Sequence, residues 1–203
     1  MGYSHCHPFL HSLFIRSSII YGLSLSVSVM TPKISPENIN SEIPVEAKAA
    51  IADLVLAWAR FDALVSQLFI VCYGMTLDVG ALFVGNMDTR TKFDKLIKLY
   101  SHFGLSGADN LKTLRKLHGK HVDLRNTINH AACVGHLISD TGYIVFAPVK
   151  AVHGQIDEML IEAWHLDQFK AATEFASKNG DKLNELVDAF MKKRPKSAPP
   201  DRQ

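Results

Sequence analysis

The chain has 203 residues, of which 47% are hydrophobic and 21% are charged. These values are typical of a globular protein with one sizeable core, and they exclude a chain dominated by disorder or by membrane spans. The formal net charge of +2 does not by itself indicate nucleic-acid binding, which requires basic side chains clustered on one surface.

The cysteines are Cys6, Cys72 and Cys133, an odd number without the spacing of metal ligands. They favour a reducing compartment and argue against a disulfide framework. We therefore expect a cytoplasmic protein in which Cys72 is a small core residue.

Residues 1–30 differ from the rest of the chain. Their uninterrupted apolar part, residues 17–30, has only fourteen residues, fewer than the roughly 20 of a spanning helix. Three interpretations stay open: translation starts at Met30, the segment is a signal peptide, or it anchors the protein to a membrane. Without such an anchor we expect no membrane partner. Because translation of this segment is in doubt, we assign no metal to its potential ligands, His5, Cys6, His7 and His11.

A polar lead-in over residues 31–45 should precede one domain over residues 46–193. Its first helix, from Val45, is apolar on nearly every face, so it must be covered on both sides. One side can be the core and the other a second copy, which predicts a homodimer. Arg60 and Asp62 interrupt this pattern; we interpret them as a solvated pair, with a position beside a cleft as the alternative.

A second helix should be capped by Asp88 or Thr89 and stop at Gly104. Its lysines, Lys92, Lys95 and Lys98, are expected on a solvated face.

The next helix is predicted to begin with a capping box formed by Ser106 and Asp109. Its apolar residues recur at helical spacing and should face the core. They are Leu114, Leu117, Leu124 and Ile128.

Near the end of this helix stand Arg125, Asn126 and His130. Relative to Leu124, at about 100° per residue, they lie at about 100°, 200° and 240° around the axis. The three side chains therefore lie off the core stripe, where they are available to a ligand or a second subunit. Asn126 and His130 should share one face.

The order Arg, polar residue, three further residues and His, late in a helix of a helical bundle, resembles the signature of the HEPN superfamily. This resemblance covers roughly residues 46–135 and the closing helix. It implies a metal-independent endoribonuclease in which two protomers place their Arg and His in one cleft. The implied reaction is attack of an RNA 2′-hydroxyl on the adjacent phosphate, giving a 2′,3′-cyclic phosphate. Arg125 would hold the phosphoryl oxygens, and His130 would transfer protons. Asn126 would orient the imidazole or the phosphate.

Basic residues also decorate this helix, and we expect them to bind RNA; the alternative is an ordinary solvated face. They are Lys112, Arg115, Lys116 and Lys120.

His118 and His121 are three residues apart, a spacing that suits one metal ion. No carboxylate pair or cysteine nearby completes a site, so we favour core or interface histidines and expect neither metal nor cofactor. Serine and cysteine nucleophile motifs do not occur in the sequence.

After His130 the pattern changes to that of strands. Residues 134–139 and 143–149 should form a hairpin around the turn at residues 140–142, and residues 159–164 a third strand. The β insert thus spans residues 134–164. A last helix is expected from about Asp167 to Lys192, with a break at Asn179 and Gly180 as one option. Residues 194–203 should be disordered.

The predicted fold is mainly α: a HEPN-like helical bundle with a small antiparallel hairpin or meander before the last helix. The leading functional hypothesis is a homodimeric endoribonuclease, in a toxin or phage-defence setting with an antitoxin partner. The alternative is a non-catalytic interaction module that binds RNA or a nucleotide. A metalloprotein using His118 and His121 is a third, weaker hypothesis.

Overall fold

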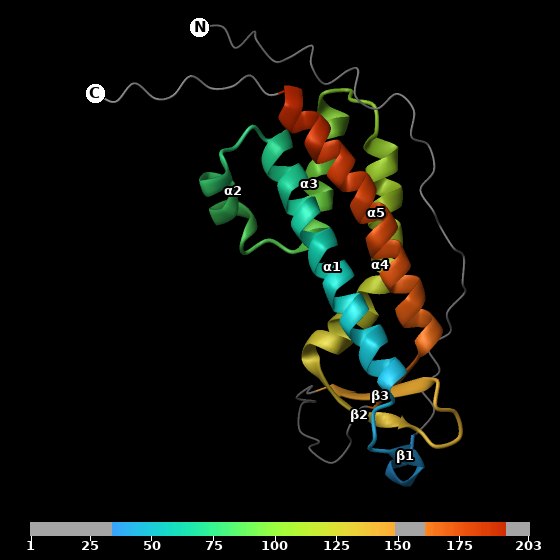
Figure 1. Ribbon diagram of the computed structural model, residues 1–203. Coiled ribbons are helices and arrows are strands. Elements are labelled where there is room, and N and C mark those ends of the chain that lie inside the picture. Colours follow the sequence, from blue (N-terminus) through green and yellow to red (C-terminus); the bar gives the residue numbers. More distant parts are fainter. Residues whose placement is uncertain (1–33, 149–160, 194–203) are drawn as a thin grey trace, which may run out of the picture.

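In the computed structural model, four long helices stand side by side, and a small sheet lies at one end of them (Figure 1). The structure describes residues 34–148 and 161–193. Some predictions fall outside these residues. They concern residues 1–30 with their potential metal ligands, the tail at 194–203 and part of the third strand.

The described residues form the helices α1 (Val45–Cys72), α2 (Leu77–Val84), α3 (Thr89–His102), α4 (Ala108–His130) and α5 (Leu166–Lys193). All of them except α2 begin and end close to the expected residues. Gly74 follows α1 with a φ of 66°, the left-handed conformation that favours glycine. Asp88 caps α3, because its Oδ1 accepts a hydrogen bond from the Thr91 backbone N–H at 2.6 Å.

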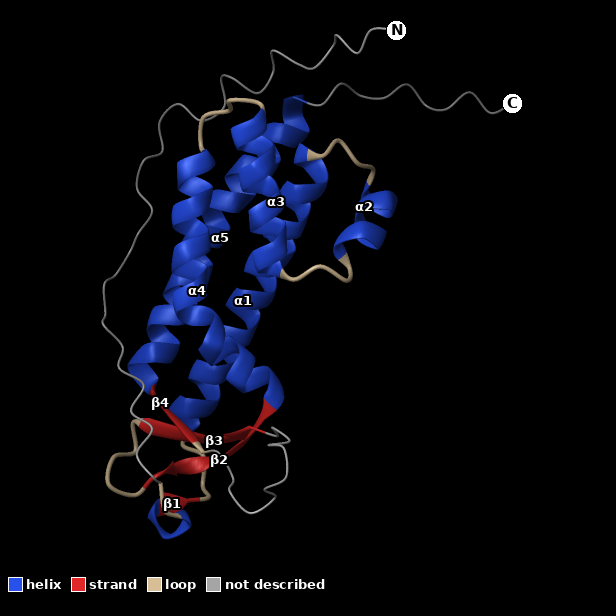
Figure 2. Cartoon of the chain, turned by 180° about the vertical axis from the view of Figure 1, so that it is seen from behind, coloured by secondary structure: helices blue, strands red, loops and turns tan. Residues whose placement is uncertain are grey.

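Helix α2 was not predicted. Thr76 caps it, and Gly80 packs so closely on α1 that an added Cβ would lie 2.5 Å from the Ile70 side chain. Figure 2 shows α2 standing beside the bundle. Its large apolar side chains are mostly exposed: Leu77, Val79, Leu82 and Phe83. Its eight residues are too few for a helical period to be read from the sequence.

The core lies between the four long helices and contains a cluster of rings. Trp58 and Phe61 from α1, Phe93 from α3 and Phe175 from α5 are all buried there. The predicted apolar stripe of α4 is also found, with Leu114, Leu117 and Leu124 buried and Ile128 packed at its edge.

Four antiparallel strands form one sheet in the order β1-β2-β3-β4. They are β1 (Ile39–Asn40), β2 (Ala131–Leu137), β3 (Tyr143–Pro148) and β4 (Glu162–His165). The mainly α fold with a small antiparallel sheet before the last helix is therefore confirmed. The sheet begins earlier than expected, because β2 follows His130 directly.

The polar lead-in contains a strand that was not predicted, β1, which pairs with β2. Gly135 makes this pairing possible, since it has a φ of 141° and an added Cβ would lie 1.9 Å from the Asn40 carbonyl oxygen. A strand of two residues has no recognisable period in a sequence.

Helix α5 is continuous, so the break considered at Asn179 and Gly180 does not occur. Asn179 is buried, and its side-chain amide donates to the Phe175 carbonyl one turn earlier at 2.9 Å. Gly180 faces Leu64 of α1, to which an added Cβ would lie at an ordinary packing distance of 3.7 Å. Tertiary packing along α1 thus overrides the local preference of the Asn-Gly pair.

By length and composition α1 is apolar enough to cross a membrane, a test that core helices of soluble proteins also pass. In the fold its buried side chains face α3, α4 and α5, whereas Val55 and Leu56 are exposed. The prediction that this helix is apolar beyond its core side agrees with these exposures.

Candidate functional site

Helix α4 carries the Arg-Asn-x-x-x-His motif, and it begins differently from the prediction. Its N-cap is Gly107, with a φ of 105° and no capping side chain. The capping box of Ser106 and Asp109 is therefore wrong; Asp109 instead accepts a hydrogen bond from Lys112 at 2.9 Å. A glycine in the left-handed conformation reverses the chain immediately before the first turn, which leaves Ser106 one residue outside the cap.

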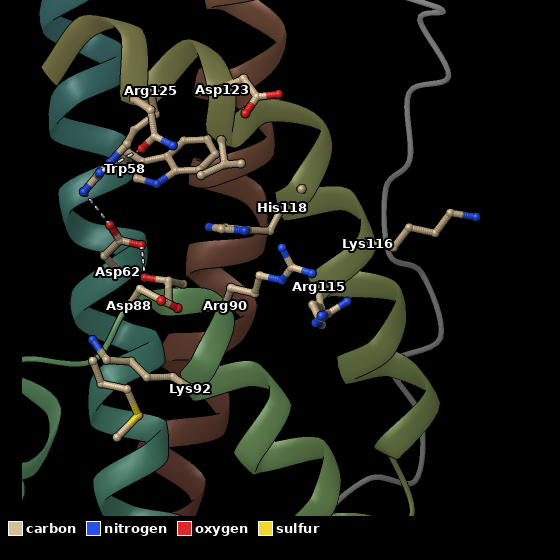
Figure 3. Close-up of a pocket in the computed structure, with 15 residues that line it drawn as sticks. Trp58, Asp62, Asp88, Arg90, Lys92, Arg115, Lys116, His118, Asp123 and Arg125 are labelled. Atoms are coloured by element: carbon tan, nitrogen blue, oxygen red, sulfur yellow. Dashed lines mark hydrogen bonds and ion pairs between the residues drawn. The ribbon is translucent and has the colours of Figure 1, made fainter. Parts of the chain in front are cut away.

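Arg125 joins the motif to α1. Its guanidinium donates to the Asp62 carboxylate at 3.3 Å and to the Asn126 side-chain oxygen at 3.2 Å. Asp62 also accepts a hydrogen bond from the Thr89 hydroxyl, on α3, at 2.7 Å. Three helices thus converge on one carboxylate, and the dashed lines in Figure 3 follow this chain of contacts.

Asp62 therefore does not form a solvated pair with Arg60. Arg60 pairs with Asp181 of α5 at 2.9 Å, on an exposed part of the surface. The Asp62 side chain is 23% exposed and lines a pocket. This agrees with the alternative interpretation, a position beside a cleft.

The pocket beside Arg125 has a volume of about 780 Å³ and lies between α1, the start of α3 and α4. Cationic side chains outnumber acidic ones in its lining: Arg90, Lys92, Arg115, Lys116 and Arg125 against Asp62, Asp88 and Asp123. The N-terminal end of α3 opens toward it as well, which adds partial positive charge. This arrangement favours an anionic ligand.

The motif residues are only partly brought together. Arg125 and Asn126 line the pocket, but His130 does not. Five residues correspond to about 500° of helical rotation, so Arg125 and His130 point about 140° apart. His130 is exposed as the last residue of α4, where the chain enters β2.

The basic residues expected to bind RNA divide in the same way. Arg115 and Lys116 line the pocket, whereas Lys112 and Lys120 are exposed elsewhere on α4. The Arg115 guanidinium donates to Asp94 of α3 at 3.2 Å. Figure 3 shows Lys116 extending away from the other labelled side chains.

Lys92 was expected on a solvated face, and this was wrong. It is 7% exposed, and its ammonium donates to the Ser66 hydroxyl of α1 at 2.9 Å. Burial lowers the pKa of Lys92, against the opposing effect of Asp62 and Asp88. The equal spacing of Lys92, Lys95 and Lys98 gave no sign that one of them is buried. Lys92 is the one next to the core residue Phe93.

His118, expected to be a core or interface histidine, also lines the pocket. It is 4% exposed, and its ring packs against Trp58 and Phe61 with centroid distances of 5.5 and 6.0 Å. His121 stacks instead on Phe175, at 5.1 Å. The core position expected for the pair is thus found for His118, while His121 is partly buried. Among the described residues no group of three metal-ligand side chains is assembled.

Cys72, expected in the core, is partly buried against it and contacts the Tyr100 hydroxyl at 3.7 Å. Burial raises the pKa of its thiol to about 12, which disfavours the thiolate form that nucleophilic chemistry requires.

No family model, no curated protein and no solved structure matches this chain.

Proposed function

We propose that this protein is a metal-independent endoribonuclease of the HEPN type. The observation that carries the proposal is the position of Arg125 and Asn126 in a cationic pocket, with an exposed imidazole at the end of the same helix. A guanidinium that is two-thirds buried and held by Asp62 is oriented before any ligand binds. Such preorganised charge is what stabilises the transition state of phosphoryl transfer.

In the proposed reaction, the RNA 2′-oxygen forms a bond to the adjacent phosphorus as the bond to the 5′-oxygen breaks. His130 of one copy takes the proton of the 2′-hydroxyl. The protonated imidazole of the second copy gives a proton to the departing 5′-oxygen. Arg125 neutralises the charge that grows on the equatorial phosphoryl oxygens, and Asn126 orients the phosphate. The products are a 2′,3′-cyclic phosphate and a 5′-hydroxyl.

A homodimer is part of this proposal, because one copy presents Arg125 and His130 in different directions. A second copy would bring its own imidazole to the cleft. Exposed apolar side chains on α1 and α2 support such an interface: Val55, Leu56, Leu77, Leu82 and Phe83. The resemblance also suggests a toxin or defence setting with an antitoxin partner, and a neighbouring gene for a small protein would support it.

The test is cleavage of single-stranded RNA by the full chain and by Arg125→Ala and His130→Ala. We expect losses of about 10² to 10³-fold for the arginine and about 10² to 10⁴-fold for the histidine. Arg125→Lys should restore little, since an ammonium lacks the planar fork of donors. Activity should persist in EDTA and leave cyclic-phosphate ends.

Matched controls are Arg60→Ala and His102→Ala. Arg60 is a surface arginine paired with Asp181, and His102 is exposed at the last residue of α3, as His130 is on α4. Both should keep full activity. Metal-dependent cutting, or full activity in His130→Ala, would refute the mechanism.

The second candidate is a non-catalytic module that binds RNA or a nucleotide. It is favoured by the ion pair between Arg125 and Asp62, which already neutralises much of the guanidinium charge, and by the absence of His130 from the pocket lining. RNA binding that requires Arg125, without cleavage, would select this candidate.

A further inference from the structure

His118 is a buried imidazole that opens onto the pocket. Its ring is enclosed by Trp58, Phe61 and Phe93, which offer no hydrogen-bond acceptor to a ring nitrogen. Its side chain makes no hydrogen bond with any residue in the described ranges, although it is 4% exposed. Figure 3 shows it reaching inward from α4 toward α1. Buried polar groups in native proteins are nearly always hydrogen-bonded, so this imidazole is suited to a partner inside the pocket.

Two arginines on the other wall of the pocket indicate the charge of that partner. Figure 3 shows Arg90 reaching from α3 toward Arg115 on α4. Arg115 is paired with Asp94, but Arg90 has no hydrogen bond or ion pair with a residue that the structure describes. Arg90 is therefore the guanidinium whose donors remain available to an anion in the pocket, and the charge of Arg115 adds to the attraction. Phosphate oxygens match the planar donors of both.

The size of the pocket limits the partner further. A volume of about 780 Å³ is within the range of pockets that enclose drug-sized ligands, roughly 300 to 1,000 Å³. A nucleoside phosphate is small enough for such a space, which has arginines on one wall and the imidazole on another.

We propose that the pocket binds a nucleoside phosphate and that His118 is the residue that hydrogen-bonds it, with Arg90 and Arg115 holding the phosphate. If the nucleotide is part of an RNA chain, this inference rests on the proposed function. Nucleotide binding itself requires neither His130 nor a second copy of the protein. A free nucleotide is the other source of the same chemistry. Single copies of the protein should therefore bind one nucleotide each.

The experiment is calorimetric titration of the full chain with adenosine 3′-monophosphate, with adenosine, and with a 2′-O-methyl oligoribonucleotide that cannot be cleaved. The nucleotide should bind at least tenfold more tightly than adenosine. His118→Phe keeps the aromatic packing but removes the hydrogen bond, so it should weaken nucleotide binding about tenfold. Arg90→Ala should weaken it to a similar extent. His121→Phe is the matched control and should stay within twofold, because His121 stacks on Phe175 and does not line the pocket.

A second measurement does not depend on a folded variant. In the unaltered protein, the ring signals of His118 in a nuclear magnetic resonance spectrum should shift during titration with adenosine 3′-monophosphate, and those of His121 should not. The same titration is made with the 2′-O-methyl oligoribonucleotide. If only this oligoribonucleotide shifts the His118 signals, the pocket binds a nucleotide within an RNA chain. If adenosine 3′-monophosphate shifts them too, a free nucleotide is sufficient.

Two results separate this inference from the proposed function. RNA cleavage that is unchanged in both KM and kcat by His118→Phe, with no shift of the His118 signals by either probe, overturns the inference alone. Nucleotide binding that depends on His118, without cleavage of any RNA, refutes the ribonuclease and leaves the inference standing.

Discussion

Thr127 ties the motif helix to the sheet through one side-chain hydrogen bond. Its hydroxyl donates to the Glu162 carboxylate of β4 at 2.7 Å, and Thr127 is buried. Thr127→Val keeps the shape but removes the donor, so it should lower the free energy of unfolding by about 1.5 to 3 kcal/mol, as for hydrogen bonds to charged groups. Urea denaturation measures the change.

Thr113→Val is the control for that substitution. Thr113 is exposed on the same helix, and its hydroxyl donates to the Asp109 carbonyl of its own preceding turn. Its loss should change stability by less than about 0.5 kcal/mol. Equal effects for both threonines would show that the contact between α4 and β4 contributes no stability.

His118 also makes stability depend on pH. Burial lowers its pKa below the usual 6.5; Asp62 on α1 and Asp88 at the start of α3 oppose the shift, and Arg125 and His121 add to it. The unfolded chain therefore binds a proton first as pH falls. The free energy of unfolding should be undiminished above pH 6.5 and should decline below it, until the pH passes the folded-state pKa.

His118→Phe tests this dependence, because phenylalanine fills the aromatic site without a titrating group. Denaturation at pH 7.5 and pH 5.5 should show a smaller difference for the variant than for the unaltered chain. His121, whose pKa is also lowered by burial, would supply the remainder. An identical pH dependence in the variant would contradict the buried, neutral imidazole.

At the scale of elements, Gly135 decides whether β1 can join the sheet. A Cβ there would lie 1.9 Å from the Asn40 carbonyl oxygen, on a backbone with a φ of 141°. Gly135→Ala should therefore separate β1 from β2 and cost about 2 kcal/mol or more. Hydrogen exchange of the Ile138 amide, which donates to the Asn38 carbonyl, would report the separation.

Gly119→Ala is expected to act in the opposite direction. Gly119 lies within α4, and an added Cβ would meet nothing within 4 Å. Alanine in a helix interior is more stable than glycine by about 0.5 to 1 kcal/mol. A stabilised Gly119→Ala beside a destabilised Gly135→Ala would show that space and backbone conformation, and not glycine content, determine these effects.

Elements were predictable where their period was long enough. The apolar residues of α1, α3, α4 and α5 recur over three or more turns, and each helix was located to within a few residues. The missed elements, α2 and β1, are short and depend on contacts with distant residues. Gly80 fits against Ile70, and Gly135 fits against Asn40. No period or cap within the short segment encodes such a contact.

At the scale of the whole molecule, the exposed side chains of α2 predict self-association. Sedimentation of the full chain should give twice the monomer mass of 22.5 kDa. Leu82→Glu with Phe83→Glu should shift the protein toward monomer, since these side chains are 82% and 60% exposed and their replacement leaves the core intact. Circular dichroism should stay unchanged.

Ile138→Glu is the control, because Ile138 is 61% exposed and directly follows β2, at the end of the bundle where the sheet lies. It should remain a dimer. A monodisperse monomer at micromolar concentration for the unaltered chain would count against a shared active site and for a pocket that works in one copy.

The sequence alone determined the mainly α fold, the β hairpin after His130, and the helix that carries Arg125, Asn126 and His130. These follow from periodicity and residue type, which act over neighbouring residues. The tertiary structure decided which side chains share a site. It placed Asp62 against Arg125, brought Arg90 and His118 into the same pocket, and left His130 outside it. Residues 62 and 125 are far apart in the chain, and their contact depends on how α1 packs against α4, which no local pattern specifies.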